Sequence, residues 1–140
     1  MIEMIGDLIA GILGLIRKGE FQQASESLES AYYEFLKEDA SFLQSIPKEN
    51  LTEKLLTEHN YGNGHLEILA ELFYAQAELF YAQAIKNKSL EFYEKSLILM
   101  EFVTRESKSF SLDKQSKISL IKNRIEQLIE GERKMEKGES

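Results

Sequence analysis

The sequence predicts an all-α protein with about five or six antiparallel helices in one domain, which spans residues 1–130. Apolar side chains recur every three or four residues over most of the chain, as they do in helices that pack on a core. The chain has a single proline, and its shortest breaks between periodic segments favour antiparallel neighbours. With 140 residues, 43% of them apolar, it can bury one core of ordinary size. Residues 131–140 lack apolar periodicity and are expected to be frayed.

The first helix is expected over residues 2–17, where the apolar positions fall within one broad stripe. Gly6, Ala10 and Gly14 recur every four residues on one flank of this helix. Small side chains at that spacing favour close approach by another helix. Gly19 then breaks the pattern, as a glycine at a helix C-terminus does.

A second helix is expected over residues 20–37, and the short connection makes it the antiparallel partner of the first. Residues 39–58 carry a weaker signal of two short helical segments, the second of which begins at Pro47. Residues 59–64 are rich in glycine and asparagine and form a loop.

The fourth segment, residues 65–86, contains the sequence ELFYAQA twice in succession, at 71–77 and 78–84. Seven residues are nearly two helical turns, so each side chain stacks above its copy. The segment is apolar on nearly all sides, which indicates a central helix packed against several neighbours. Near-complete burial is expected for Leu28, Phe73, Ala77, Phe80 and Leu97.

Two further helices complete the chain. A polar turn at residues 86–88 leads into a helix over residues 89–106, and the last helix is expected over residues 112–131. Ser109 or Ser111 should cap that last helix through its hydroxyl.

Two of the hairpins resemble tetratricopeptide (TPR) repeats, which are helix pairs with small residues where the helices cross. In the first hairpin the pattern positions hold Leu8, Leu15, Gly19, Phe21, Ala24, Leu28 and Ala31. In the second they hold Phe73, Ala77, Phe80, Ser89, Tyr93 and Ser96, with serine in place of the usual alanine at two positions. The resemblance covers about half of the chain and implies a TPR-like right-handed stack.

A second resemblance covers nearly the whole chain. The segments KGEFQQA, LTEKLL, HLEILAELFYAQAE, KSLEFYEKSLILMEF and SFSLDKQSKISLIKNRI follow one another in an order similar to that of a family of small uncharacterised bacterial proteins with TPR-like helices. This resemblance implies the fold and carries no catalytic residues with it.

Composition argues against several classes of function. The chain has no cysteine and two histidines, so a thiol nucleophile and a cysteine-based zinc site are excluded. His59 and His65 flank the loop near Glu58 and Glu67, but their spacing matches no helical metal motif, and we expect no metal and no cofactor.

The charge pattern argues against nucleic acid and membrane partners. The net charge is −7, and the basic residues between Arg105 and Arg124 are typical of a solvated helix face. The N-terminal segment has acidic residues first and basic residues last, the inverse of a secretory signal. A cytoplasmic location is therefore expected.

We expect a non-enzymatic adaptor that binds a protein or peptide in a helical groove. The repeat stacks two glutamates and two tyrosines on one flank of the central segment, and the groove is expected at Glu71, Tyr74, Glu78 and Tyr81. Glutamate beside tyrosine can also act as an acid–base pair, a less favoured interpretation. Two alternatives stay open: the tyrosines pack under residues 39–58, or the protein is a homo-oligomer, such as a homo-dimer, that buries its first or central helix against a second copy.

Overall fold

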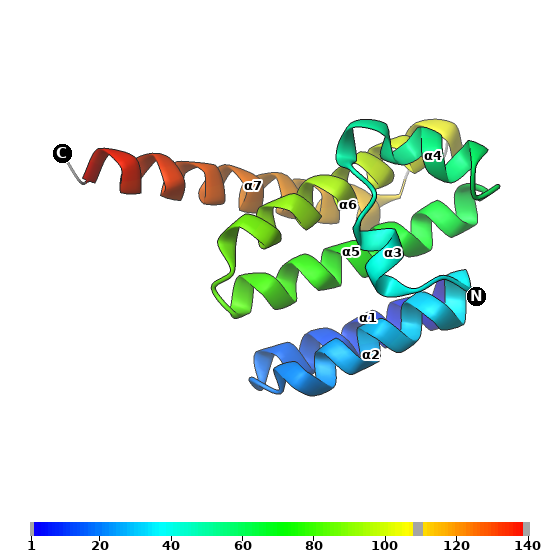
Figure 1. The fold of residues 1–140 in the computed structure, drawn as a ribbon, viewed down its shortest axis with the longest axis horizontal. Helices are drawn as coiled ribbons and strands as arrows, with labels where there is room; N and C mark the ends of the chain where they lie inside the picture. Colours follow the sequence, from blue (N-terminus) through cyan, green and yellow to red (C-terminus); the bar gives the residue numbers. More distant parts are fainter. Residues whose placement is uncertain (1, 108–110, 139–140) are drawn as a thin grey trace.

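The computed structural model describes the backbone of residues 2–107 and 111–138 and the side chains of residues 5–107 and 111–131. The described part is helical and contains no strand (Figure 1). Its elements in chain order are α1 (Ile2–Arg17), α2 (Phe21–Leu36), α3 (Ala40–Gln44), the 3₁₀ turn η1 (Lys48–Asn50), α4 (Leu51–Thr57), α5 (Asn63–Ala82), α6 (Lys86–Ser107) and α7 (Leu112–Gly138). The all-α prediction is confirmed, although the described residues form seven α-helices rather than five or six.

The helix ends follow local backbone chemistry. Gly19 has a φ of +80°, so the predicted glycine stop after the first helix is confirmed. The turn predicted at residues 86–88 is wrong: it lies at residues 83–85, where Ala84 has a φ of +64°, and α6 begins at Lys86. The Ser111 hydroxyl accepts a hydrogen bond from the Lys114 amide and caps α7, whereas Ser109 lies outside the described residues.

The last helix is longer than the sequence pattern indicates. The backbone of α7 stays helical to Gly138, past residue 131, where the frayed tail was expected to begin. Backbone hydrogen bonds therefore continue through residues that lack an apolar stripe.

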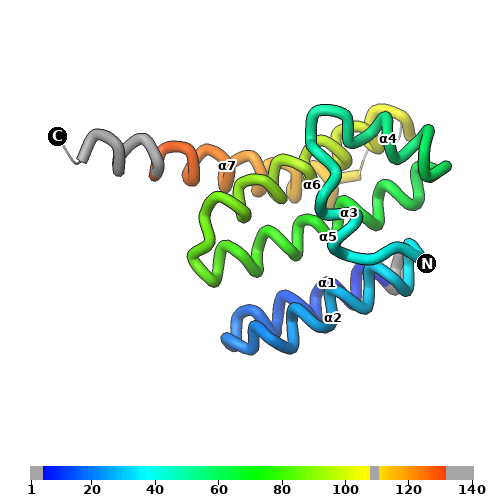
Figure 2. The backbone as a smooth tube through the Cα atoms, viewed as in Figure 1, coloured from blue at the N-terminus to red at the C-terminus, as the bar shows by residue number. Residues whose placement is uncertain are grey.

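The elements pack around α5, which contacts α1, α2 and α6. In Figure 1, α1, α5 and α7 run in one direction, while α2 and α6 run in the opposite direction. The tube view shows the α1–α2 hairpin on one side of α5, with α6 and α7 on the other (Figure 2). The predicted central position of the duplicated segment is confirmed.

Burial supports the predicted core with two exceptions. Leu28, Phe73 and Ala77 are buried as expected. Phe80 is half-buried because it lies near the end of α5, where Lys88 covers one side of its ring. Leu97 is half-buried because it follows Ser96, which faces α5, and therefore lies roughly 100° around α6 from that contact. Near-complete burial of Phe80 and Leu97 is therefore a wrong prediction.

Small residues bring α5 and α6 together. The hydroxyl of Ser89 donates to the backbone carbonyl of Ala77 at 3.0 Å, and that of Ser96 donates to the carbonyl of Ala70 at 2.8 Å. All four residues are buried. Serine can therefore take the place of alanine at this crossing, because each hydroxyl finds an acceptor on the neighbouring helix.

The small residues of α1 behave differently. A Cβ added to Gly6 or Gly14 would meet nothing within 4 Å, and Ala10 is exposed. The expected close approach of another helix is therefore wrong for the described part of this chain. The exposed flank of α1 faces outward.

Candidate interaction surfaces

The four residues of the predicted groove face α7. Glu71 pairs with Lys117 at 2.7 Å, and Glu78 pairs with Arg124 at 3.5 Å. Glu67 of α5 likewise pairs with Lys114 of α7. The pairs are separated by an almost constant 46 or 47 residues, so α5 and α7 run parallel and meet along a row of ion pairs. These glutamates therefore contact α7 of the same chain where a separate partner was expected.

The two tyrosines of the predicted groove differ in exposure. Tyr74 is 4% exposed, with its ring beneath the Lys117 ammonium at 5.0 Å. A groove residue must be accessible to a partner, so the prediction that Tyr74 lines an open groove is wrong. Tyr81 is 38% exposed and lies 4.1 Å from the Arg124 guanidinium. These cations come from α7, so the covering element here is α7 rather than residues 39–58.

Glu78 of α5 contacts both α6 and α7. Its carboxylate accepts a hydrogen bond from the Tyr93 hydroxyl of α6 and also pairs with Arg124. Burial, followed by the Glu78 carboxylate, raises the pKa of Tyr93. Burial also raises the pKa of Tyr74 to about 12, and the Glu78 charge adds to that effect. Both phenols are therefore neutral near pH 7 and pack within this contact, and Tyr93 also donates a hydrogen bond to Glu78.

The two histidines lie in a row of aromatic rings. His59 contacts the rings of Phe42 and Tyr61, and His65 stacks on Tyr61 with centroids 4.9 Å apart. Nδ1 of His65 accepts a hydrogen bond from the Gly62 amide at the start of α5. The described residues contain no group of three or more potential metal ligands. Both side chains have local structural partners.

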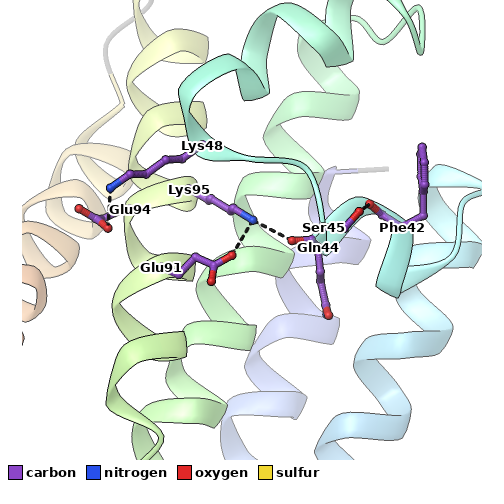
Figure 3. A network of polar contacts seen from close by, with 7 residues as sticks. All are labelled: Phe42, Gln44, Ser45, Lys48, Glu91, Glu94 and Lys95. Carbon is purple, nitrogen blue, oxygen red and sulfur yellow. Dashed lines mark hydrogen bonds and ion pairs between the residues drawn. The ribbon is translucent and has the colours of Figure 1, made fainter.

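A buried lysine joins α6 to the segment between α2 and α5. Lys95 is 2% exposed, and its ammonium donates to the Gln44 carbonyl at 2.7 Å and pairs with Glu91 at 2.8 Å (Figure 3). Lys48 pairs with Glu94 at 3.1 Å on the same side of α6. These contacts anchor residues 39–58 to α6.

An open cleft of about 430 Å³ lies between α1 and α2. The half-buried side chains of Leu8 and Leu15 and the buried Ala31 form its apolar lining. Its exposed polar lining includes Glu26 and Glu34 of α2. This volume lies within the range of known ligand sites, and every residue that lines the cleft belongs to α1 or α2.

The sequence analysis did not identify the basic residues of α7 that cover the predicted groove. The basic residues of α7 were interpreted as a solvated face, yet Lys114, Lys117 and Arg124 each pair with a glutamate of α5. The available signal was the opposite charge of the two halves of the chain. Lys95 gave no signal because lysine is mostly exposed in proteins and its neighbours in the sequence, Glu94 and Ser96, are polar.

Comparisons with known proteins identify no relative: no family model, curated protein or solved structure matches this chain. Among the described residues, no helix combines the length and the hydropathy needed to cross a bilayer.

Proposed function

We propose that this protein is a non-enzymatic adaptor that binds a protein or peptide partner in the cleft between α1 and α2. The observation that carries the proposal is the position of this cleft. It combines an apolar lining with exposed polar side chains, and its lining residues all belong to α1 and α2. Binding grooves of helical proteins have this combination of an apolar body and a polar rim.

The packing supports the TPR-like stack within this proposal. Helices α1, α5 and α7 run parallel, and α2 and α6 run antiparallel to them, as in stacked helical hairpins (Figure 1). Serine and alanine occupy the crossing of α5 and α6, where TPR repeats have small residues. Helical stacks of this kind bind partners on the extended surfaces that their stacked helices create.

The groove predicted at Glu71, Tyr74, Glu78 and Tyr81 is less suited to a partner because α7 lies over it. The α1–α2 cleft is open, and Tyr33, elsewhere on α2, carries an aromatic ring that is 62% exposed. An exposed aromatic side chain on a rigid helix loses little entropy when it binds, so it is a natural anchor.

The homo-oligomer is the weaker alternative. The apolar faces of α1 and α5 are buried inside this chain: Ile5, Ile9 and Ile12 are each at most 2% exposed, and Phe73 is fully buried. Among the side chains that the structure describes, neither helix therefore offers the large apolar face that an obligate dimer buries.

Site-specific photo-cross-linking tests the proposal. A photoreactive amino acid replaces Ser30 in the cleft, and a matched protein carries it at the exposed Asn123 of α7. In lysate of the cells that make this protein, we expect one discrete adduct with another protein from position 30 and none from position 123. No adduct at position 30, or equal labelling from both positions, would refute the α1–α2 cleft as the partner site.

A further inference from the structure

The α1–α2 cleft has an acidic side that lacks cationic partners. Helix α2 carries three glutamates, Glu26, Glu29 and Glu34, and no lysine or arginine. In the described part of the chain, Glu26 and Glu34 form no ion pair, and both are exposed where they line the cleft. A bound molecule with positive charges would meet two free carboxylates there.

The rest of the chain shows what such carboxylates bind. On α5, Glu67, Glu71 and Glu78 are paired with lysine or arginine of α7, a helix that lies parallel to α5. This protein therefore already packs one basic helix along one acidic helix. The carboxylates of α2 have the same chemistry, and in the described part of the chain Glu26 and Glu34 have no basic helix paired with them.

The spacing of the cleft residues matches a helix. Glu26 and Glu34 are eight residues apart, which is about 12 Å along α2 at roughly 1.5 Å per residue. Leu8 and Leu15 are seven residues apart and share one face of α1 with Gly11, which lies between them. A Cβ at Gly11 would meet nothing within 4 Å, so the backbone of α1 is open to an approaching side chain.

From this arrangement we propose that the occupant of the cleft is a cationic amphipathic helix of another protein. Its lysine or arginine residues, seven or eight positions apart, pair with Glu26 and Glu34, and its apolar side chains lie over Leu8 and Leu15. This inference rests on the proposed function, because it takes the α1–α2 cleft as the partner site. It adds the charge and the secondary structure of the partner.

The test uses three fluorescein-labelled helical peptides of 16 residues. They share a leucine and alanine background and carry lysine, glutamine or glutamate at positions 1, 8 and 15. Binding is measured by fluorescence anisotropy at 50 mM NaCl, with the full chain as titrant. We expect the lysine peptide to bind at least tenfold more tightly than the glutamine peptide, and the glutamate peptide to bind most weakly.

A matched pair of charge reversals locates the binding. The cleft variant is Glu26→Lys with Glu34→Lys, and the control is Glu58→Lys with Glu126→Lys, two exposed residues outside the hairpin that change the net charge equally. Circular dichroism checks that both variants are folded. The cleft variant should lose at least tenfold in affinity for the lysine peptide and the control about twofold or less.

A third variant fills the space at Gly11. Gly11→Gln keeps the net charge and places a side chain where a Cβ meets no neighbour, so the fold should be retained. It should lower the affinity for the lysine peptide several-fold, because the new side chain blocks the approach to α1 between Leu8 and Leu15.

Several results would overturn the inference. Equal losses in the cleft and control variants would show attraction to net charge alone. Equal affinity for the glutamine and lysine peptides would refute the cationic partner and leave the adaptor proposal standing, since a helix would still bind. A dimer that the cleft reversals dissociate would identify a second copy as the occupant. If no peptide binds, the cationic helix is refuted, and the cross-link at position 30 separately decides whether the cleft binds a partner.

Discussion

Replacing Lys95 by alanine should destabilise the protein because this side chain joins α6 to the end of α3. Its ammonium donates to the Gln44 carbonyl at 2.7 Å and lies 5.0 Å from the centre of the Phe92 ring, while the whole side chain is 2% exposed. Two contributions are lost on replacement: the charge-assisted hydrogen bond and the burial of the methylene groups. The pair with Glu91 adds little, since Glu91 is 46% exposed.

The magnitude follows from these contacts. A hydrogen bond to a charged group contributes about 1.5–3 kcal/mol, and three buried methylenes contribute about 0.8 kcal/mol each. The cost of burying the ammonium, several kcal/mol, opposes both. We expect Lys95→Ala to lower the free energy of unfolding by about 3 kcal/mol, which corresponds to a fall in Tm of roughly 10 °C for a chain of this size.

Lys95→Met is the matched control because it keeps most of the apolar stem and removes the charge. It should cost only about 1 kcal/mol, since losing the hydrogen bond to Gln44 is partly offset by no longer burying a charge. Urea denaturation followed by circular dichroism measures both variants. The chain has no tryptophan, so Phe42→Trp adds a single fluorescent reporter on the anchored segment.

Two results would refute this reasoning. The first is a free energy of unfolding for Lys95→Ala within 0.5 kcal/mol of that of the parent protein, about the value of a weak surface ion pair. The contacts of Lys95 would then contribute nothing to stability. If Lys95→Met costs as much as Lys95→Ala, the packing of the stem on Phe73 and Phe92 is not what stabilises this contact.

Three more expectations concern the core, the exposed flank of α1 and the buried phenols. Phe73→Ala should cost about 3–5 kcal/mol in urea denaturation and Phe80→Ala distinctly less, because Phe80 is half-buried; equal losses would contradict the burial described here. Gly11→Ala should raise the free energy of unfolding by up to about 1 kcal/mol, because the new methyl meets no neighbour; a loss of stability would show a contact there. The pKa of Tyr74 is raised to about 12 in the folded state, while that of an unfolded tyrosine is about 10. The contribution of Tyr74 to the free energy of unfolding is therefore fully present below about pH 10. It falls as the pH rises towards 12, by up to about 1.4 kcal/mol per pH unit. Denaturation curves between pH 8 and pH 11.5 measure the fall, and Tyr74→Phe should reduce it; an unchanged pH dependence would exclude Tyr74 as a cause.

Most of the helices could be predicted from periodicity because each is a local property of the sequence. The first helix has the predicted bounds, and the duplicated segment has the predicted central position. The turn after α5 was misplaced because Ala84 adopts a left-handed conformation that alanine rarely takes. No residue typical of turns marks residues 83–85.

The sequence could not show whether the predicted groove is open, because a helix more than 40 residues away covers it. The repeat correctly placed Glu71 and Glu78 on one flank of α5. Which cations would meet that flank depends on how α7 returns along α5, which periodicity does not encode. Tyr74 shows the limit: its place on the helix was right, and its exposure was wrong because Lys117 lies over it.

The charges explain why a partner surface should lie on α2 rather than on α5. Residues of α7 neutralise the carboxylates of α5 by pairing with three glutamates, so a basic partner would have to displace a covalently linked helix. An intramolecular helix has a high effective concentration, and a partner in solution competes poorly against it. Glu26 and Glu34 face no such competitor on the described part of the chain, and they stand beside an apolar cleft. Ion pairing therefore covers the acidic flank of α5 with α7, and it leaves the acidic flank of α2 available to a basic helix of a partner.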